Sequence, residues 1–313
     1  MLEKSLSIIF FGSPEFALPS FNALLDSQYE VAAVVTQPDK PKGRGKHITP
    51  TPVAHVAQKK NIPVIKSSKI TPDVLEKIKS YNCPLGVVVA YGALLPQELL
   101  DIFPMGVLNI HPSLLPKYRG ASPLQGPILA GDKKTGVSIM LLDSGLDSGP
   151  ILLQESIQIE PHDTVKTIHN VLAKKGALLL LQAIDGLVDG TLVSQDQDHE
   201  KATFTKKIKK QDGEIDWTKG AENIDRHIRA YTGWPGAYTK WKGLQCVIHK
   251  AHIAEVNPVE SPGTVFIYQN DVCIATSNGA LVIDEMQLQN KQKNAPSAFI
   301  KGHQDFIGSI LPS

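Results

Sequence analysis

The sequence predicts an α/β fold in two domains, a helix-covered parallel sheet followed by a small β-barrel. Three observations lead to this prediction. In the first half of the chain, apolar runs of strand length alternate with segments that carry apolar residues at helical spacing. Near residue 200 the sequence becomes polar and aperiodic. Short strand-like runs separated by Gly, Asn and Pro then follow, which is typical of an all-β domain.

The elements of the first domain follow from local signals. Thr71 is the expected N-cap of one helix, because Pro72 suits the first helical position. The expected strands span residues 6–11, 29–36, 62–65, 85–90, 107–110 and 137–142, and the expected helices residues 16–25, 52–60, 72–80, 96–102 and 164–186. Apolar strands that alternate with helices indicate a parallel sheet, whose ligands bind beyond the carboxyl ends of the strands.

The second half of the chain has a different plan. The polar residues 190–205 are the expected linker, which divides a first domain (1–189) from a second domain (206–313). In the second domain we expect a helix over residues 220–231 and strands over residues 236–241, 245–254, 263–268, 272–276 and 280–286. This regular spacing of short strands predicts a barrel.

Composition limits the possible functions. The 313 residues carry a formal net charge of +1, so a nucleic-acid partner would need a local basic patch. The cysteines, Cys83, Cys246 and Cys273, form no CxxC pair, which fits a reducing compartment and argues against a disulfide framework or zinc knuckle. The N-terminus lacks a full signal peptide, and no run of about 18 apolar residues exists. We therefore predict a soluble, cytoplasmic protein with no membrane span.

Polar side chains gather at the end of one expected strand, within LNIHPSLLPKYRGASPLQ (residues 108–125). Asn109 and His111 flank Ile110, and residues i and i+2 of a strand point to the same side. Pro112 then breaks the strand. The pattern has two interpretations, an ordinary capping turn or one wall of an active site.

A second polar stretch favours the active site. LLDSGLDSGP (residues 141–150) also follows an apolar strand and places Asp143 and Asp147 among glycines that let the backbone turn tightly. We expect a carboxylate from this stretch to meet His111 across adjacent strand ends. Asn109 and a protonated His111 can donate hydrogen bonds to an oxyanion, while Asp147 can favour the imidazolium and help to remove a proton from an attacking amine. The sequence thus predicts direct acyl transfer.

Covalent and metal catalysis fit these residues less well. Ser113 and Ser148 are the candidate nucleophiles, but neither lies in a GxSxG turn. A metal site would have too few good ligands, and Asn is a poor ligand for zinc. We therefore predict no metal cofactor.

Taken together, these motifs resemble the folate-dependent formyltransferase family. The resemblance rests on Asn109-Ile-His111-Pro-Ser113-Leu114-Leu115-Pro116, on Tyr118-Arg119-Gly120-Ala121 and on Asp143-Ser-Gly145-Leu146-Asp147-Ser148-Gly149. It implies a Rossmann-like formyltransferase domain, an OB-like C-terminal barrel and 10-formyltetrahydrofolate as the formyl donor. By this resemblance Asn109, His111 and Asp147 would be catalytic. The implied folate-binding residues are Val89, Ala90, Tyr91, Gly92, Ser113, Leu114, Leu115 and Pro116.

The resemblance also bears on the acceptor, because members of the family formylate glycinamide ribonucleotide, a sugar nucleotide or the methionine on initiator tRNA. FFGSPEFALPSF (residues 10–21), QPDKPKGRGKHITPTP (residues 37–52) and the β domain after residue 205 resemble the last class. It implies initiator tRNA as the partner and translation initiation as the role. A sugar-nucleotide enzyme and a tRNA-binding module with a vestigial site remain the alternatives. We predict a monomer, since the two-domain plan needs no partner to bury its cores.

Two local basic segments fit a nucleic-acid partner. In residues 37–52, Asp39 is outnumbered by cations, and we expect the prolines to prevent regular structure. Such a loop can order against phosphates, where Arg44 can fork two acceptor atoms. The expected tRNA-binding residues are Lys42, Arg44 and Lys46 of this loop and Lys206, Lys207 and Lys209 at the start of the second domain. A solvated loop and a solubilising charge run are the alternative interpretations.

Overall fold

The computed structural model describes residues 6–42 and 47–313, and the chain divides into two compact units. The first unit consists of Met1–Pro123, Lys134–Gln158 and His169–Thr205. The second consists of Leu124–Lys133, Ile159–Ile168 and Lys206–Ser313. The boundary between the units is therefore not a single point near residue 200, because Leu124–Lys133 and Ile159–Ile168 also belong to the second unit.

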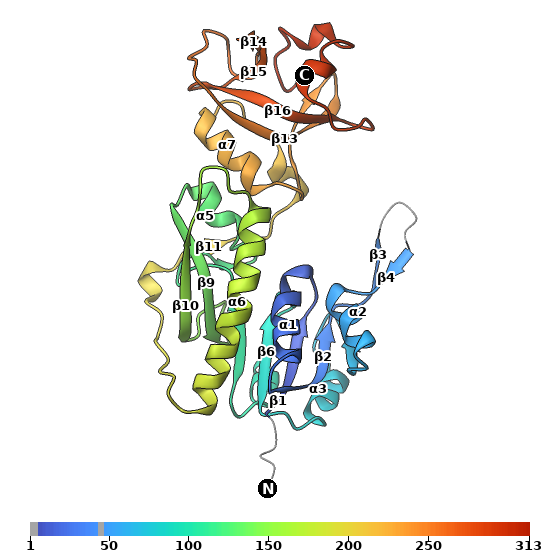
Figure 1. Cartoon of the computed structure of the whole chain (residues 1–313), viewed down its shortest axis with the longest axis vertical. Coiled ribbons are helices and arrows are strands. Elements are labelled where there is room, and N and C mark those ends of the chain that lie inside the picture. Colours follow the sequence, from blue (N-terminus) through green and yellow to red (C-terminus); the bar gives the residue numbers. More distant parts are fainter. Residues whose placement is uncertain (1–5, 43–46) are drawn as a thin grey trace. The chain divides into compact units, whose positions relative to one another are not determined.

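The first unit is built on a seven-stranded sheet with the order β10-β9-β7-β6-β1-β2-β5 (Figure 1). Its strands are β1 (Ser7–Gly12), β2 (Glu30–Thr36), β5 (Val64–Lys66), β6 (Leu85–Val89), β7 (Val107–His111), β9 (Lys134–Leu141) and β10 (Ile151–Gln158). The strands from β7 to β5 pair in parallel. β9 pairs antiparallel with both β7 and β10, which corrects the expectation of a parallel sheet. β10 has no long apolar run that would predict it, because it is an edge strand whose burial alternates after its first two residues.

Helices cover both faces of this sheet. They are α1 (Leu18–Leu25), α2 (Pro52–Lys59), α3 (Pro72–Lys79), α4 (Gln97–Leu100) and α6 (Val165–Val188). Phe10 of β1 packs on Phe21 of α1, with ring centroids 5.0 Å apart. The next residue, Phe11, points to the opposite face and contacts Phe103 just after α4. The alternation of β1 side chains thus separates two helical layers.

Two threonines precede helices in the first unit, and the capping hydrogen bond is made by Thr51 rather than by the expected Thr71. Thr71 precedes α3 as expected, but its side chain makes no capping hydrogen bond. Thr51 caps α2 instead, because its hydroxyl accepts a hydrogen bond of 3.2 Å from the backbone N–H of Ala54. Thr51 also contacts Thr36 at the end of β2, with 2.6 Å between the hydroxyl oxygens. The two ends of the basic loop are therefore tied together at its base.

The basic loop contains regular structure. β3 (Lys40–Lys42) pairs antiparallel with β4 (His47–Thr49), so the expectation that prolines prevent regular structure is wrong for these residues. A proline is tolerated because this two-stranded ribbon is an edge on both sides. Lys42 is the last residue of β3, whereas Arg44 and Lys46 lie outside the described residues.

The expected linker, residues 190–205, is packed onto the first unit. Gln195 exchanges two backbone hydrogen bonds of 2.8 Å with Ile151, the first residue of β10. Farther on, β11 (Phe204–Thr205) pairs in parallel with the short strand β8 (Arg119–Gly120). Such short pairings carry no period in the sequence, which explains why the segment looked like a loop.

The second unit contains a five-stranded antiparallel sheet with the order β12-β13-β16-β15-β14. Its elements are α5 (Gln125–Ala130), α7 (Ala221–Ala230), β12 (Ala237–Trp241), β13 (Leu244–Ala254), β14 (Val265–Tyr268), β15 (Asp271–Ala275), β16 (Ala280–Leu288) and α8 (Pro296–Phe299). The C-terminal tail joins the two edges: the N–H of Leu311 donates to Gly263 O beside β14, and the N–H of Ser313 donates to Lys240 O of β12. The tail thereby closes the β-rich unit.

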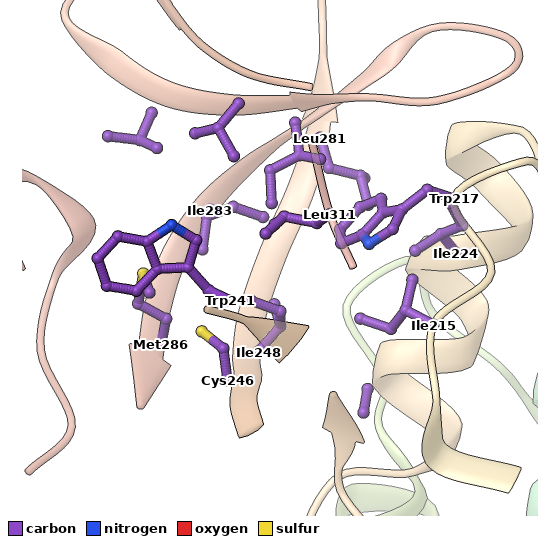
Figure 2. Packing of buried hydrophobic residues seen from close by; sticks show 14 of the residues in the cluster. Ile215, Trp217, Ile224, Trp241, Cys246, Ile248, Leu281, Ile283, Met286 and Leu311 are labelled. Carbon is purple, nitrogen blue, oxygen red and sulfur yellow. The ribbon is translucent and has the colours of Figure 1, made fainter. Parts of the chain in front are cut away.

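The core of the second unit lies between this sheet and α7 (Figure 2). Trp217, Trp241 and Leu281 are among its buried residues. The indole N–H of Trp217 donates to the hydroxyl of Thr239 at 3.1 Å, which satisfies its one polar atom. The three cysteines of the chain are buried free thiols. Among the described helices, none has the length and apolar character that crossing a membrane would require.

Candidate active site

The side chains of strand β7 point to two faces: one apolar side chain packs against a helix, and two polar side chains lie on the opposite face. Ile110 packs on Gly176 of α6, where an added Cβ would come within 2.8 Å of its side chain. Asn109 and His111 therefore point to the face away from α6. Both are buried, with 8% and 4% of their surface exposed. The backbone of Asn109 pairs with Val88 of β6, so the end of β6 lies beside it.

Asp147 meets His111 by an unexpected route. β9 runs antiparallel to β7, and the N–H of Leu142 donates to the carbonyl of Val107 at the start of β7. The loop that follows must then fold back along β7, which corrects the expectation of a meeting across adjacent strand ends. Asp147 Oδ2 ends 3.6 Å from His111 Nδ1. The backbone of Asp147 is left-handed (φ 48°), an uncommon conformation for a residue with a side chain.

The hydrogen bond of the imidazole fixes its tautomer. His111 Nε2 lies 3.0 Å from the backbone oxygen of Tyr118, and a carbonyl can only accept, so Nε2 carries the proton. Burial lowers the pKa of His111 below its ordinary value of 6.5, although the nearby Asp147 carboxylate acts to raise it. The ring is therefore neutral at pH 7, and Nδ1 presents a lone pair toward Asp147. Asp147 thus favours the imidazolium, as expected, but burial has the larger effect and lowers the pKa of His111.

The two aspartates of the loop have different roles in the structure. Asp147 Oδ2 accepts a hydrogen bond of 2.7 Å from the N–H of Gly120, and 16% of its side chain is exposed. Asp143 is turned to solvent, where its carboxylate accepts from the hydroxyl of Ser148 at 2.9 Å and from the N–H of Gly145 at 3.0 Å. Asp143 thus shapes the turn, while Asp147 faces the imidazole.

Asn109 has a free amide. Among the described residues, no other group forms a hydrogen bond with its side chain, whereas its position on β7 is fixed by backbone pairing on both sides. An amide held in this way can donate to an oxygen of a bound molecule without first breaking a bond.

The expected folate-binding turn after β7 divides into buried and accessible residues. Ser113 is fully buried, and its hydroxyl donates to Lys117 O at 2.6 Å. Leu115 is 4% exposed and packs in a small apolar cluster beside β9. These two side chains build the turn, whereas Leu114 and Pro116 are half-buried.

The expected folate-binding residues at the end of β6 and just after it also alternate between buried and accessible. Val89 and Tyr91 are buried, and the hydroxyl of Tyr91 donates to Ser67 O at 2.7 Å. Ala90 and Gly92 are exposed and have positive φ angles of 49° and 85°. The segment therefore offers backbone groups to a ligand rather than its two largest side chains.

The basic residues lie on exposed surface where the structure describes them. Lys206, Lys207 and Lys209 are exposed at the start of the second unit. The β3–β4 ribbon belongs to the first unit, and the side chains of β4 are exposed. Asp39, the acid of this loop, is paired with Lys66 at 2.8 Å.

Sequence reasoning missed two residues of the site. Arg119 and Gln197 are buried, at 4% and 6% exposure, and hydrogen-bond to each other beside the Asp147 loop. Arg119 stands in a motif but had no role assigned to it. Gln197 gave no signal, because it is one polar residue in a polar segment. Within residues 6–42 and 47–313, no three His, Cys, Asp or Glu side chains gather as a metal site would require.

Two protein-family models match the chain. The formyl transferase model matches residues 5–184, and the formyl transferase C-terminal domain model matches residues 207–304. Among individual proteins, the methionyl-tRNA formyltransferase of Trichlorobacter lovleyi is 40% identical over 306 residues, which cover 97% of this chain and 96% of that protein.

Solved structures share the fold. The N-formyltransferase from Helicobacter canadensis, in complex with folinic acid and dTDP-3-aminofucose, aligns with a TM-score of 0.67 at 20% identity over 93% of this chain and 100% of that one. HypX from Aquifex aeolicus, in complex with tetrahydrofolic acid, aligns with a TM-score of 0.65 at 19% identity over 94% of this chain. The chain spans 46% of the length of HypX. At these identities the likeness concerns the fold alone.

Proposed function

The chain belongs to the formyl transferase family, and from this membership we propose that it formylates the methionine carried by initiator tRNA, with 10-formyltetrahydrofolate as donor. The observation that carries the acceptor is the 40% identity, over 97% of the chain, to a methionyl-tRNA formyltransferase. The product, formylmethionyl-tRNA, starts translation. The enzyme acts in the cytoplasm, as a monomer.

Asn109, His111 and Asp147 carry out the transfer in this proposal. The α-amino group of methionine attacks the formyl carbon, and the side-chain amide of Asn109 donates a hydrogen bond to the oxyanion that forms. The neutral His111 accepts the amine proton at Nδ1, directly or through water. Asp147, 3.6 Å away, stabilises the positive charge that this proton brings to the imidazole.

The second half of the reaction uses the same proton. The bond between the formyl carbon and the folate nitrogen breaks, and His111 returns its proton to that nitrogen. The products are tetrahydrofolate and the formylated amine, so atoms and charge balance without a covalent enzyme intermediate. The lowered pKa of His111 keeps the ring neutral at the start of each cycle.

The folate pocket in this proposal lies over the ends of β6 and β7. The accessible Leu114 and Pro116 contact the donor from one side, and the exposed backbone of Ala90 and Gly92 from the other. Four buried side chains support these two segments without facing the donor: Ser113, Leu115, Val89 and Tyr91. Folate-type ligands in the HypX and Helicobacter canadensis structures support a folate donor.

The basic segments bind the acceptor stem of the tRNA in this proposal, and the second unit is a tRNA-binding domain. In this proposal Lys42, Arg44 and Lys46, from the basic segment of residues 37–52, contact phosphates. Lys206, Lys207 and Lys209 do so from the second unit. Support comes from the exposure of these three lysines and from the pairing of Asp39 with Lys66, which removes the one opposing carboxylate of the loop.

A transfer assay with three acceptors tests the function. The chain is incubated with 10-formyltetrahydrofolate and either methionyl initiator tRNA, glycinamide ribonucleotide or a dTDP-linked amino sugar. We expect formylation of the tRNA alone. Transfer to a small molecule with none to tRNA would overturn the acceptor, and no transfer to any of them would overturn the enzyme.

A further inference from the structure

A single buried amide joins three parts of the site. Oε1 of Gln197 accepts from Arg119 Nε at 3.0 Å and from Nη2 at 2.7 Å. Nε2 of Gln197 donates to Asp147 O at 2.9 Å and to Gly149 O at 2.7 Å. Both lone pairs and both hydrogens of the amide are therefore used, which leaves Gln197 one orientation. Gln197 therefore fixes the backbone of the loop that carries the Asp147 carboxylate.

The arginine beside this amide is a buried cation with neutral partners. Arg119 is 4% exposed, and its side chain bonds to Gln197 and to His199 Nδ1, 3.2 Å from Nη2. No carboxylate in the described part of the chain forms an ion pair with it. Burying an unpaired charge costs stability, so a purely structural explanation would favour a neutral side chain here. Retaining the charge points to a use for it in the site.

The main chain around Arg119 touches both reacting side chains. Tyr118, just before it, accepts the hydrogen bond of His111, and Gly120, just after it, donates to Asp147. Thr203 and Thr205 hold this stretch from the other side: the N–H of Arg119 donates to Thr203 O at 2.9 Å, and the hydroxyl of Thr205 donates to Arg119 O at 3.1 Å. The segment that looked like a linker thus braces three consecutive residues that orient the pair.

We propose that Gln197 and Arg119 are positioning residues, which hold the Asp147 carboxylate and the Tyr118–Gly120 stretch in the places that the His111–Asp147 pair requires. The role rests on the proposed function. Arg119 has a second effect through its charge. It acts with burial to lower the pKa of His111, against the raising effect of Asp147. Among the described residues, Arg119 and Asp147 are the charged groups that act on the pKa of the ring.

Gln197→Glu tests the role with little change in size. The carboxylate keeps the contacts with Arg119 but cannot donate to the two carbonyls, so the Asp147 backbone loses its support. We expect kcat to fall about 10- to 100-fold, because small misplacements of reacting groups cost this much. The KM values for folate and tRNA should stay within about twofold, since the proposed role of both residues is to position Asp147 and the Tyr118–Gly120 stretch rather than to bind a substrate. The matched control is Gln195→Glu, two residues earlier with an exposed side chain, which should retain the wild-type rate.

Variants of Arg119 separate positioning from folding. Arg119→Lys keeps the charge but loses the pair of hydrogen bonds from Nε and Nη2 to Gln197. We therefore expect kcat to fall while the acid limb of the pH–rate profile stays in place. Arg119→Met also removes the charge. The pKa of His111 should then rise, and because His111 must be neutral to accept a proton, the acid limb should move to higher pH. A merely structural role would change melting temperature and active fraction without moving that limb.

The outcomes divide clearly. Gln197→Glu and Arg119→Lys should be non-additive when combined, because they act through one network. Wild-type kcat in Gln197→Glu or a loss confined to KM would each overturn the positioning role, and an unmoved acid limb in Arg119→Met would overturn the effect of its charge on His111. If Gln197→Glu does not fold, Arg119→Lys carries the kcat test. An inactive wild-type chain would overturn the proposed function itself, whereas active wild type with fully active variants would overturn this inference alone.

Discussion

The His111–Asp147 site and the basic segments hold charged and polar groups in opposite surroundings. His111 is 4% exposed, and both it and Asp147 are hydrogen-bonded to the stretch that Arg119 and Gln197 brace. Lys206, Lys207 and Lys209 are exposed on the second unit. Burial fixes a tautomer and shifts a pKa, which suits proton transfer. Exposure keeps a cation solvated and adaptable, which suits a phosphate backbone.

The comparison separates rate from recognition. Changes in the buried site should reduce kcat with little effect on KM for tRNA, and changes in the basic segments should do the reverse. A residue that behaved like a member of the other group would break this division.

The largest effect should come from the imidazole. His111→Ala removes the proton acceptor, and we expect transfer to slow by at least about a hundredfold, the usual scale for a general acid–base residue. Single-turnover formylation at saturating substrates measures it, with His249→Ala, a partly buried histidine of the second unit, as the control. A near-normal rate in His111→Ala would remove the imidazole from the chemistry.

A smaller loss should follow from disturbing the loop without touching its side chains. In Gly149→Ala the new Cβ would collide with the backbone oxygen of Leu141, so the loop must shift and carry Asp147 with it. We expect kcat to fall about tenfold or more. Gly302→Ala is the matched control, because its Cβ would meet nothing closer than 4.0 Å. Equal activity of the two variants would mean that the position of Asp147 is not critical.

Arg44→Ala should affect the tRNA substrate. The loss of one forked contact to phosphate should raise KM for tRNA about tenfold, which corresponds to about 1.4 kcal/mol. Neither kcat at saturating tRNA nor KM for folate should change much. A lower melting temperature would show instead that the loop supports the fold, and unchanged KM would exclude Arg44 from the interface.

Lys207→Ala should give a weaker form of the same result. One exposed lysine contributes a single screened contact, so we expect KM for tRNA to rise about threefold. The salt dependence of binding is the sharper readout, because each lost phosphate contact lowers the slope of log K against log salt by about 0.7 to 0.9. An unchanged slope would leave this lysine as a solubilising charge.

The smallest expected effect is the loss of rate and of stability at acidic pH that follows from the lowered pKa of His111. Burial lowers the pKa of His111 below 6.5, so the rate should fall only when the pH drops below that value. Folding should follow the same sign: the unfolded chain takes up a proton on His111 near pH 6.5 and the folded chain does so lower, so this contribution to stability is lost as the pH falls through the folded pKa. A rate that already halves above pH 7 would mean that the ring is protonated at rest.

Much of the fold could be predicted from apolar periodicity, whereas the site could be predicted only in part. β1, β6 and β7 are buried runs, so their places were predictable. The direction of β9 was not, because pairing direction depends on contacts distant in sequence. That direction forces the Asp147 loop to fold back along β7. Gln197 was invisible for a similar reason, since its importance lies in four hydrogen bonds to residues 48 or more positions away.

The central claim is that Asp147 and the neutral His111 act as one proton-transfer pair. Asp147→Asn tests it most directly, because the amide keeps the size of the side chain and removes its charge. Single-turnover rates with saturating 10-formyltetrahydrofolate and methionyl initiator tRNA should be measured across pH 5 to 8. The account expects a loss of at least about a hundredfold. It also expects an acid limb displaced to lower pH, because Asp147 raises the pKa of His111. A variant with a near-normal rate and an unmoved limb would contradict the claim.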